Sequence, residues 1–491
     1  MELINPFRVR VDWAKDGTFG TTGIDNVTDY VRGTVTASYG RDVATAVSPI
    51  VAGRGSFQLD NDDRRFSPFN AGSPIGANLK PARPVLLERI VGGVAYSILA
   101  GHTDTAPINP DVDSRTVTFT VVDYLGDFRT APMATTLYQG MRTGELIDQT
   151  LTEIGWTGGR DLDDGATIVP YWWSGENAYD ALQKLVASEG APALLSIGPA
   201  GEVVFRDRTH RLIRAASTTV QATWRGTEGA VEPVMGKGFA WDAGWNGVLN
   251  DVSFSVDERE PDGALTPVWS TPETIHLGAS ASQTFIATTS DPFRDAVAPQ
   301  DVFDFRTLSG SVASTSLSRT SGASTVITVT AGAGGAVIAG LQLRAYSIPV
   351  ARTVGVREND ATSITDYGRR NLPPDAIPVW ASRWDAVSLA DLYVLQRKQP
   401  LATCQVSFTC ADHQTARLAA VLARDIGDRV RIIEPETQTN HDFFIESIAH
   451  NIDLRTGAHT VTFGCERAPS APTNPFILNT STLNGSATLG Y

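Results

Sequence analysis

A glycine-rich stretch is the first feature of this sequence that could support chemistry. Thr330–Val337 follows a predicted strand and is similar to the loop that holds the pyrophosphate of a dinucleotide. Such a loop needs Gly or Ala at its third key position, where this chain has Val337, and a following helix whose N-terminus faces the phosphates. The next residues alternate instead as a strand that contains Gly340 and Pro349. We therefore expect no nucleotide site here.

Two acidic stretches, Asp60–Asp63 and Asp161–Gly165, have a composition that suits calcium. A calcium-binding loop also carries Gly at its sixth position and Glu at its twelfth. Neither stretch has these residues, and the twelfth positions are Ala71 and Trp172. Because Asp readily initiates turns, we interpret both stretches as surface turns.

The seven histidines form no metal-binding motif. We expect His450 and His459 to face each other across a hairpin, as a polar pair rather than as ligands. None of the seven is spaced as His-x-x-x-His or His-Glu-x-x-His, and none has a zinc-like spacing to the cysteines: His102, His210, His276, His413, His441, His450 and His459.

The sequence marks no nucleophile and no general acid. It has no Gly-x-Ser-x-Gly elbow and no Cys in a setting typical of a nucleophile. Pairs of carboxylates arise by chance among 54 acidic residues, so they do not by themselves indicate a glycosidase. We expect no catalytic, cofactor-binding or metal-binding residues, no cofactor, and a protein that is not an enzyme.

The aromatic run Tyr171-Trp172-Trp173 could serve as a sugar platform or contact a membrane. It lies just before a predicted helix, where such side chains more often form a packing cluster or anchor an interface. We favour the packing interpretation.

The three cysteines are Cys404, Cys410 and Cys465. Cys404–Cys410 alternates like a strand, which places its two sulfurs roughly 20 Å apart and prevents them from pairing with each other. Cys465, on another predicted strand, could meet one of them. We favour buried free thiols, as expected for a protein assembled in a reducing cytoplasm.

The overall composition indicates a folded protein with several cores. The 491 residues suffice for about three or four domains of roughly 100–200 residues, and 42% of them are hydrophobic. Met1–Arg8 lacks the features of a signal peptide, and no apolar run has the 18 or so residues of a membrane helix. We expect a soluble protein made inside a cell.

The charge argues against tight binding of nucleic acid. The net charge is −14, and no basic run is longer than a pair such as Arg64-Arg65. An acidic surface repels DNA, which would suit a wall past which DNA slides. Only five of the 40 basic residues are lysines, a bias that suggests a GC-rich genome.

The pattern of apolar and turn residues predicts a mainly β, multidomain protein with a small α+β domain. Residues 1–125 are predicted as an N-terminal β-barrel-like domain. Its expected strands include Val117–Val121 and a hairpin, Pro84–Val91 and Val94–Thr103, around Gly92-Gly93. The polar connection Asp60–Pro68 interrupts this domain.

Residues 126–230 are predicted as an α+β domain with two helices. Thr143 is the expected N-cap of the first helix, Gly155 lies just past its end, and Gly190 ends the second. The expected elements, in chain order, are helix Glu145–Ile154, helix Glu176–Glu189, and a hairpin of Ala193–Ile197 and Glu202–Arg206.

The rest of the chain is predicted to return to β structure. Residues 231–355 form a β-rich domain, 356–468 form a C-terminal β-barrel-like domain with one helix, and 469–491 form an extended C-terminal tail. The expected elements are strands Val248–Val256, Thr325–Thr330 and Ala336–Ala345, helix Arg383–Arg397, then strands Arg429–Ile433, Asp442–His450 and Thr460–Cys465, with a loop at Glu434–His441.

The two ends of the chain contain similar segments. Tyr96–Thr103 and Val117–Val121 resemble Phe443–His450 and Val461–Cys465, and each pair follows a strand and a hairpin loop. One interpretation is the general likeness of β-meanders; the other is a duplication. A duplication would give one chain two similar β-barrels, so that three chains would present six in a ring.

The order of these segments resembles that of the tail-tip hub proteins, also called tail-associated or minor tail proteins, of long-tailed, non-contractile bacteriophages. The arginine bias fits a phage of a GC-rich, actinobacterial host. The resemblance spans nearly the whole chain and rests on Tyr30–Gly33, Gly55–Asp60, Asn61–Pro68, Gly144–Leu151 with Gly155-Trp156, Ala178–Glu189, Gly201–Phe205, Trp269, Glu273–Leu277, Leu341–Ala345, Ser363–Arg369, Asp425–Val430, Phe444–Glu446 and His459–Phe463.

The resemblance implies a structural hub with four domains, two of them β-barrels. It implies a homotrimer that joins the six-fold tail tube to the three-fold tip, closes the channel and lets DNA pass during ejection. The implied partners are the distal tail protein, the C-terminus of the tape-measure protein, the tail tube protein and other tip or receptor-binding proteins. DNA would pass without specific binding, the chain would not span a membrane, and it would be assembled in the host cytoplasm into the virion tail tip. A peptidase or wall hydrolase beyond the fourth domain, present in some relatives, is not expected.

Two alternatives remain open. A carbohydrate-binding, β-rich adhesin of a virion would use its Trp residues as sugar platforms, and a glycan array would reveal a specific glycan. A β-rich glycosidase would show turnover that is lost when one carboxylate pair is mutated.

Overall fold

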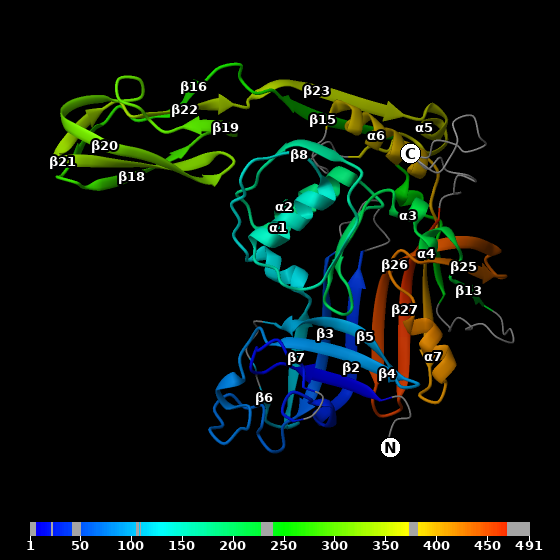
Figure 1. Cartoon of the computed structure of the whole chain (residues 1–491). Coiled ribbons are helices and arrows are strands. Elements are labelled where there is room, and N and C mark those ends of the chain that lie inside the picture. Colours follow the sequence, from blue (N-terminus) through cyan, green and yellow to red (C-terminus); the bar gives the residue numbers. More distant parts are fainter. Residues whose placement is uncertain are drawn as a thin grey trace.

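The computed structural model describes residues 6–20, 23–41, 51–104, 108, 110–226, 239–372 and 382–468. The protein is mainly β, as predicted, with its strands in several sheets (Figure 1). The predicted extended tail, 469–491, lies outside the described residues. None of the helices in the described part is long and apolar enough to cross a membrane.

Strands from both ends of the chain form one 13-stranded sheet. Its main path runs through β1 (Phe7–Val11), β4 (Pro84–Val91), β5 (Val94–Thr103), β7 (Thr116–Val122), β3 (Val51–Asp60), β2 (Val31–Gly40), β26 (Thr439–Asp453), β27 (Ala458–Arg467), β24 (Thr403–Cys410) and β14 (Ala240–Asp242). Three further strands attach to it: β6 (Pro110–Asp111), β13 (Ala222–Arg225) and β25 (Arg429–Glu434).

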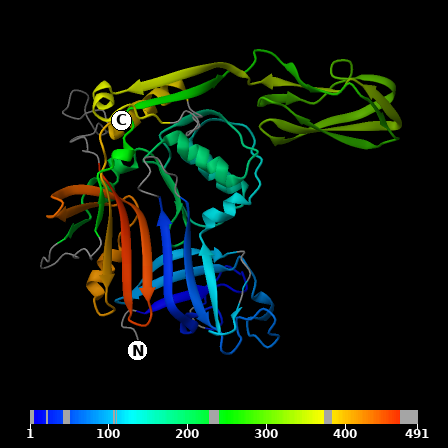
Figure 2. The same ribbon diagram turned by 180° about the vertical axis from the view of Figure 1, so that it is seen from behind.

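The two ends are joined by antiparallel pairing of β2 with β26, from Thr34 opposite Asp453 to Gly40 opposite Ser447. Both views show the blue and the orange-red strands side by side (Figures 1 and 2). The prediction of two barrel-like domains therefore needs correction, because no closed barrel is found among the described residues. Instead of closing on its own domain, β2 continues the sheet into the C-terminal strands.

The strand order repeats within this sheet. The first sheet unit, β2, β3, β4, β5 and β7, has the spatial order β4-β5-β7-β3-β2. The second sheet unit, β14, β24, β25, β26 and β27, has the order β25-β26-β27-β24-β14, which is the same order of third, fourth, fifth, second and first strand. All neighbouring strands within each unit are antiparallel. This agreement favours a duplication over a general likeness of β-meanders.

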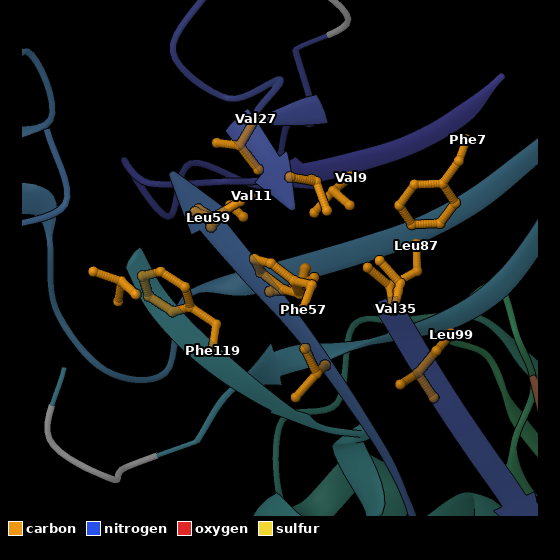
Figure 3. Packing of buried hydrophobic residues seen from close by; sticks show 14 of the residues in the cluster. Phe7, Val9, Val11, Val27, Val35, Phe57, Leu59, Leu87, Leu99 and Phe119 are labelled. Atoms are coloured by element: carbon orange, nitrogen blue, oxygen red, sulfur yellow. The ribbon is translucent and has the colours of Figure 1, made fainter. Parts of the chain in front are cut away.

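Each sheet unit packs over its own apolar core. In the first core the rings of Phe57 and Phe119 stack at 5.5 Å (Figure 3). Trp13 packs edge-on against Phe119 at 5.9 Å. Phe66, within the polar connection 60–68, also lies fully buried there, a contribution that the polar sequence around it concealed. In the second core, Trp224 from β13 contacts two phenylalanine rings of β24 and β27.

The α+β region packs two helices against short strands over a separate core. Its elements are β8 (Tyr138–Arg142), α1 (Thr143–Glu153), β9 (Arg160–Leu162), β10 (Ile168–Trp172), α2 (Ala178–Glu189), β11 (Leu194–Ile197) and β12 (Val203–Arg206), preceded by η3 (Tyr124–Arg129) and followed by α3 (His210–Ile213) and α4 (Ala215–Thr218). The predicted cap of α1 is wrong. Thr143 is the first helical residue, and its hydroxyl donates to the buried carboxylate of Glu189 instead of capping. For α2, Asn177 accepts a hydrogen bond from Asp180, so this helix begins two residues later than predicted.

An arm projects from the rest of the molecule (Figure 1). Two paired strands, β15 (Asp251–Arg259) and β23 (Val350–Asn359), form its stalk, and α6 (Arg383–Arg397) packs on them with the predicted bounds. The predicted strand Val248–Val256 starts only at Asp251. The helices α5 (Ala361–Tyr367) and α7 (Thr415–Leu422) were not predicted.

The arm itself consists of two small sheets around its own core. Thr325–Thr330 and Ala336–Ala345 were predicted as two separate strands, which is wrong. A single strand, β21, runs without interruption through the glycines between them and ends at Ala339. The arm contains β16 (Thr266–Ser270), β17 (Thr274–Leu277), β18 (Ser282–Thr288), β19 (Phe293–Val297), β20 (Arg306–Ser321), β21 (Ser324–Ala339) and β22 (Gln342–Ser347).

Candidate functional site

The glycine-rich stretch lies within β21 of the arm. Gly335 has φ +80°, and a Cβ atom there would lie 2.8 Å from the carbonyl oxygen of Leu277. The glycines therefore permit close packing of β21 against β17. A strand rather than a helix surrounds the motif, so the helix N-terminus that a dinucleotide pyrophosphate needs does not follow it.

The acidic stretches are occupied by hydrogen bonds within the chain. Asp60 accepts from Arg32 at 2.8 Å, and Asp163 contacts His210 at 2.7 Å. Asp161 is paired with Arg206 and lies in β9 rather than in the predicted turn. Among the described residues no group of three or more His, Cys, Asp or Glu side chains could hold a metal ion.

The aromatic run is a packing cluster. Trp172 is buried in the core of the α+β region. The Trp173 ring lies 5.1 Å from the guanidinium of Arg259 on the stalk, and Gly322, at the turn between β20 and β21, packs against the Trp173 side chain. Gly322 also donates to the Thr135 carbonyl at 2.8 Å, so this cluster attaches the arm to the α+β region.

The cysteines are buried free thiols, as predicted. Cys404 and Cys465 lie opposite each other on β24 and β27, and Cys410 lies opposite His459. Burial raises the pKa of Cys410 and, more strongly, that of Cys465, which keeps these thiols protonated and unreactive.

The two histidines meet close to the junction of the sheet units. His450 Nδ1 and His459 Nε2 are 3.1 Å apart, and both side chains are buried, which confirms the predicted polar pair. Burial lowers the pKa of His450 to about 4 and that of His459 well below its usual value. The pair is therefore neutral at physiological pH. The ring of Tyr39, on β2, stacks on His450 at 6.2 Å.

A buried charge cluster fixes the same junction. Glu446 on β26 contacts Arg41, which follows β2, at 3.2 Å, and Arg211 of α3 at 2.7 Å. Burial alone would raise the pKa of Glu446, but Arg211 and Arg41 outweigh it, so the pKa lies below its usual value. Arg41 also donates to the carbonyls of Pro192 and Ala193. One carboxylate thus links both sheet units to the α+β region.

A second buried contact ties the stalk to the junction. Arg397 of α6 donates two hydrogen bonds, of 2.7 and 2.9 Å, to Glu466 at the end of β27. Tyr393, also on α6, accepts a hydrogen bond from the Ala191 amide at 2.9 Å, and burial raises the pKa of this tyrosine to about 12. Removing one partner of such a buried ion pair leaves an uncompensated charge, so the pair holds α6 in its position against β27.

These junction residues were missed by sequence reasoning, although a signal existed. Glu446 interrupts the apolar run Phe443–Ile448, and Glu88 and Arg89 interrupt the apolar strand Pro84–Val91. A charge at an inward position of an apolar strand requires a buried partner. Arg89 is fully buried and contacts Asp412 at 2.9 Å and the Gly457 carbonyl at 3.3 Å. Through these buried ion pairs the junction connects the two sheet units, the α+β region and the stalk.

No protein-family model matches this sequence, and no curated protein matches it. Among solved structures, a tail protein from Neisseria meningitidis MC58 has the same fold at 10% sequence identity, with a TM-score of 0.50 over 94% of this chain and 96% of that chain. The 43 kDa tail protein of prophage MuSo2 from Shewanella oneidensis has 11% identity and a TM-score of 0.49 over 94% of this chain and 97% of that chain. The prophage tail protein gp18 from Listeria monocytogenes has 10% identity and a TM-score of 0.42 over 94% of each chain.

Proposed function

We propose that this chain is the structural hub of a bacteriophage tail tip, a homotrimer that joins a six-fold tail tube to a three-fold tip. The observation that carries the proposal is the repeated strand order of the two sheet units, which are fused by the pairing of β2 with β26. Two equivalent units per chain allow three chains to present six equivalent surfaces, which is what a junction between six-fold and three-fold symmetry needs. The shared fold of the Neisseria tail protein supports a role in a tail.

The junction chemistry supports a scaffold rather than a catalyst. The buried ion pairs of Glu446 and Glu466 hold the sheet units, the α+β region and the stalk in fixed positions. Trp172 and Trp173, the aromatic run that could serve as a sugar platform, are packed against other parts of the chain, whereas Trp241, Trp245 and Trp384 are exposed and lie apart from that run. We therefore rank the carbohydrate-binding alternative below the hub.

The division into four domains belongs to this proposal, with the stalk of β15, β23 and α6 crossing the predicted boundary at 355 and β14 joining the second sheet unit. So do the absence of catalytic, cofactor and metal residues, and the location in the virion tail tip. The proposed partners are the distal tail protein, the tail tube protein, the C-terminus of the tape-measure protein and further tip proteins. DNA passes through the channel when the hub opens.

Immunogold electron microscopy with an antibody to this chain tests the proposal on particles from its source. The hub predicts label confined to the tip of the tail, also after mild opening of the particle. Label along fibres or on the capsid, or opened particles without label, refutes the hub and favours the adhesin, which a glycan array would then identify.

A further inference from the structure

One side of the continuous sheet carries small uncharged polar side chains across six strands. The strands β7, β3, β2, β26, β27 and β24 follow one another in this sheet, and the residues that alternate with the core residues point to its other side. One row of directly opposed residues crosses all six strands: Thr120, Ser56, Thr36, Asn451, Thr460 and Thr409. All six are exposed or half-buried.

A second row lies beside the first, two residues along each strand. Its one charged residue is Arg54, which lies on β3 between Val122 of β7 and Ser38 of β2. The row consists of Val122, Arg54, Ser38, Ala449, Thr462 and Ser407. We call these two rows together the hydroxyl face. The red-orange and blue strands that carry most of it lie side by side in the view from behind (Figure 2).

The hydroxyl groups of this face bind one another across neighbouring strands. Thr36 and Ser56 are 2.8 Å apart, Ser407 and Thr462 are 2.9 Å apart, and Thr409 and Thr460 are 3.0 Å apart. Each pair satisfies part of its hydrogen-bonding capacity within the sheet. The face therefore offers fewer free groups to a partner than its composition alone indicates.

The chemistry of the face repeats together with the fold. The second and fifth strands of the first sheet unit place Ser56 opposite Thr120. The corresponding strands of the second unit place Ser407 opposite Thr462. Both units thus carry a half-buried Ser–Thr pair on the outer side of their second and fifth strands, so a ring of such units would repeat this uncharged chemistry.

The composition of the hydroxyl face restricts what it can contact. A stable protein interface needs a core of large apolar side chains, and the two rows have none larger than Val122. Binding of nucleic acid needs clustered Lys and Arg, and the rows hold Arg54 alone. Exposed faces of soluble proteins usually carry many charges of both signs, and the chain as a whole has 19% charged residues.

We propose that the hydroxyl face lines the path of the DNA and that DNA in transit is its partner. This inference rests on the proposed hub. Double-stranded DNA carries one negative charge per about 1.7 Å, so cations on the wall would hold it and anions would oppose its entry. Apart from Arg54, the two rows carry neither a cation nor an anion, and half of their residues are hydroxyls paired with one another. The acidic wall expected from the net charge is thereby replaced by a neutral one.

Lysine substitutions test this inference in virus particles. Asn451→Lys combined with Thr409→Lys adds two cations per chain on exposed positions of the face. We expect the variant particles to assemble with label at the tail tip. Their DNA release, followed with a fluorescent DNA dye after triggering, should be slower by about tenfold than that of the parent. High salt should restore the parental rate, because it screens the contacts between lysine and phosphate. The matched control Thr284→Lys, on an exposed position of β18 in the arm, should release DNA at the parental rate. Release of the double variant at the parental rate in low salt overturns the inference.

A crosslinking measurement covers the case in which the lysine variants do not assemble. Asn451→Cys is coupled to a benzophenone maleimide, and ejection is stalled by external osmotic pressure before illumination. The buried native thiols should not compete for the reagent. DNA crosslinked at position 451, but not through Thr284→Cys in the arm, supports the inference, and absence of a crosslink at 451 overturns it. Immunogold label at the tail tip of the same particles separates the two claims, because a missing crosslink then contradicts this inference and not the proposed hub.

Discussion

Replacing His450 by Asn should remove part of the acid sensitivity of the second sheet unit. The His450 ring is buried and bound to His459, and burial lowers its pKa to about 4 from the usual 6.5. Below pH 6.5 the unfolded chain takes up a proton that the folded chain refuses. The free energy of unfolding therefore falls as the pH falls from 6.5 to about 4, and this contribution levels off once the folded chain is also protonated.

The size of this effect follows from the pKa shift. The shift of His450 spans roughly 2.5 units, and one unit corresponds to about 1.4 kcal/mol, so the full loss is about 3 kcal/mol. Carboxyl groups oppose it in the same range. Burial raises the pKa of Asp123 to about 7 and that of Asp428 to about 6, so these groups favour the folded state as the pH falls. Comparison of variant and parent at each pH cancels these contributions.

Hydrogen exchange of the peptides that cover β26 and β27 is the appropriate assay, because it reports on this hairpin rather than on the whole chain. The amide of Asn lies near the position of the imidazole Nδ1 and keeps a polar partner for His459. Between pH 7 and pH 4 the parent should lose about 3 kcal/mol more of opening free energy than His450→Asn. The control His276→Asn, at an exposed position of β17, should follow the parent. An equal pH dependence of His450→Asn and parent would refute the reasoning.

Two pairs of substitutions and one labelling experiment test other parts of the structure. Arg397→Met leaves Glu466 without its partner and should lower the free energy of unfolding by about 3 kcal/mol in urea titrations. The control Arg431→Met, which removes a half-exposed ion pair, should lower the free energy of unfolding by less than about 1 kcal/mol. Gly190 has φ +72°, and the Cβ of Gly190→Ala would lie 2.2 Å from Leu389 of α6. Gly368 has nearly the same φ, +73°, but no atom lies within 4 Å of a Cβ placed there. Gly190→Ala should therefore lower the melting temperature more than Gly368→Ala. The three buried cysteines should react with a thiol reagent only after unfolding; reaction in the native protein would contradict their burial.

Local patterns in the sequence were sufficient for the local structure. Gly92 and Gly93 both adopt positive φ, as a two-residue hairpin turn requires, and the strands on either side have the predicted bounds. The bounds of α6 and the His450–His459 contact were also predicted correctly. In each case the partners lie within one hairpin or one helix, so the pattern itself contains the contact.

Contacts between distant segments were not predictable in this way. The pairing of β2 with β26 joins opposite ends of the chain, and neither strand carries a residue that specifies its partner. The ladder of Thr36, Asn451 and Thr460 depends on that register, so the hydroxyl face was also not visible in the sequence. The cap of α1 was mispredicted because Thr143 satisfies Glu189, a residue of another helix. Tertiary contacts overrode the local preference in these cases.

The most direct test of the hub is an electron cryomicroscopy map of the tail tip of particles that carry this chain. We expect three copies around the tail axis, with the two sheet units of each copy alternating in a ring of six, and with Thr36 and Asn451 facing the channel. A map in which this chain forms a peripheral fibre, or in which the two sheet units of one copy do not occupy equivalent positions around the axis, would contradict it.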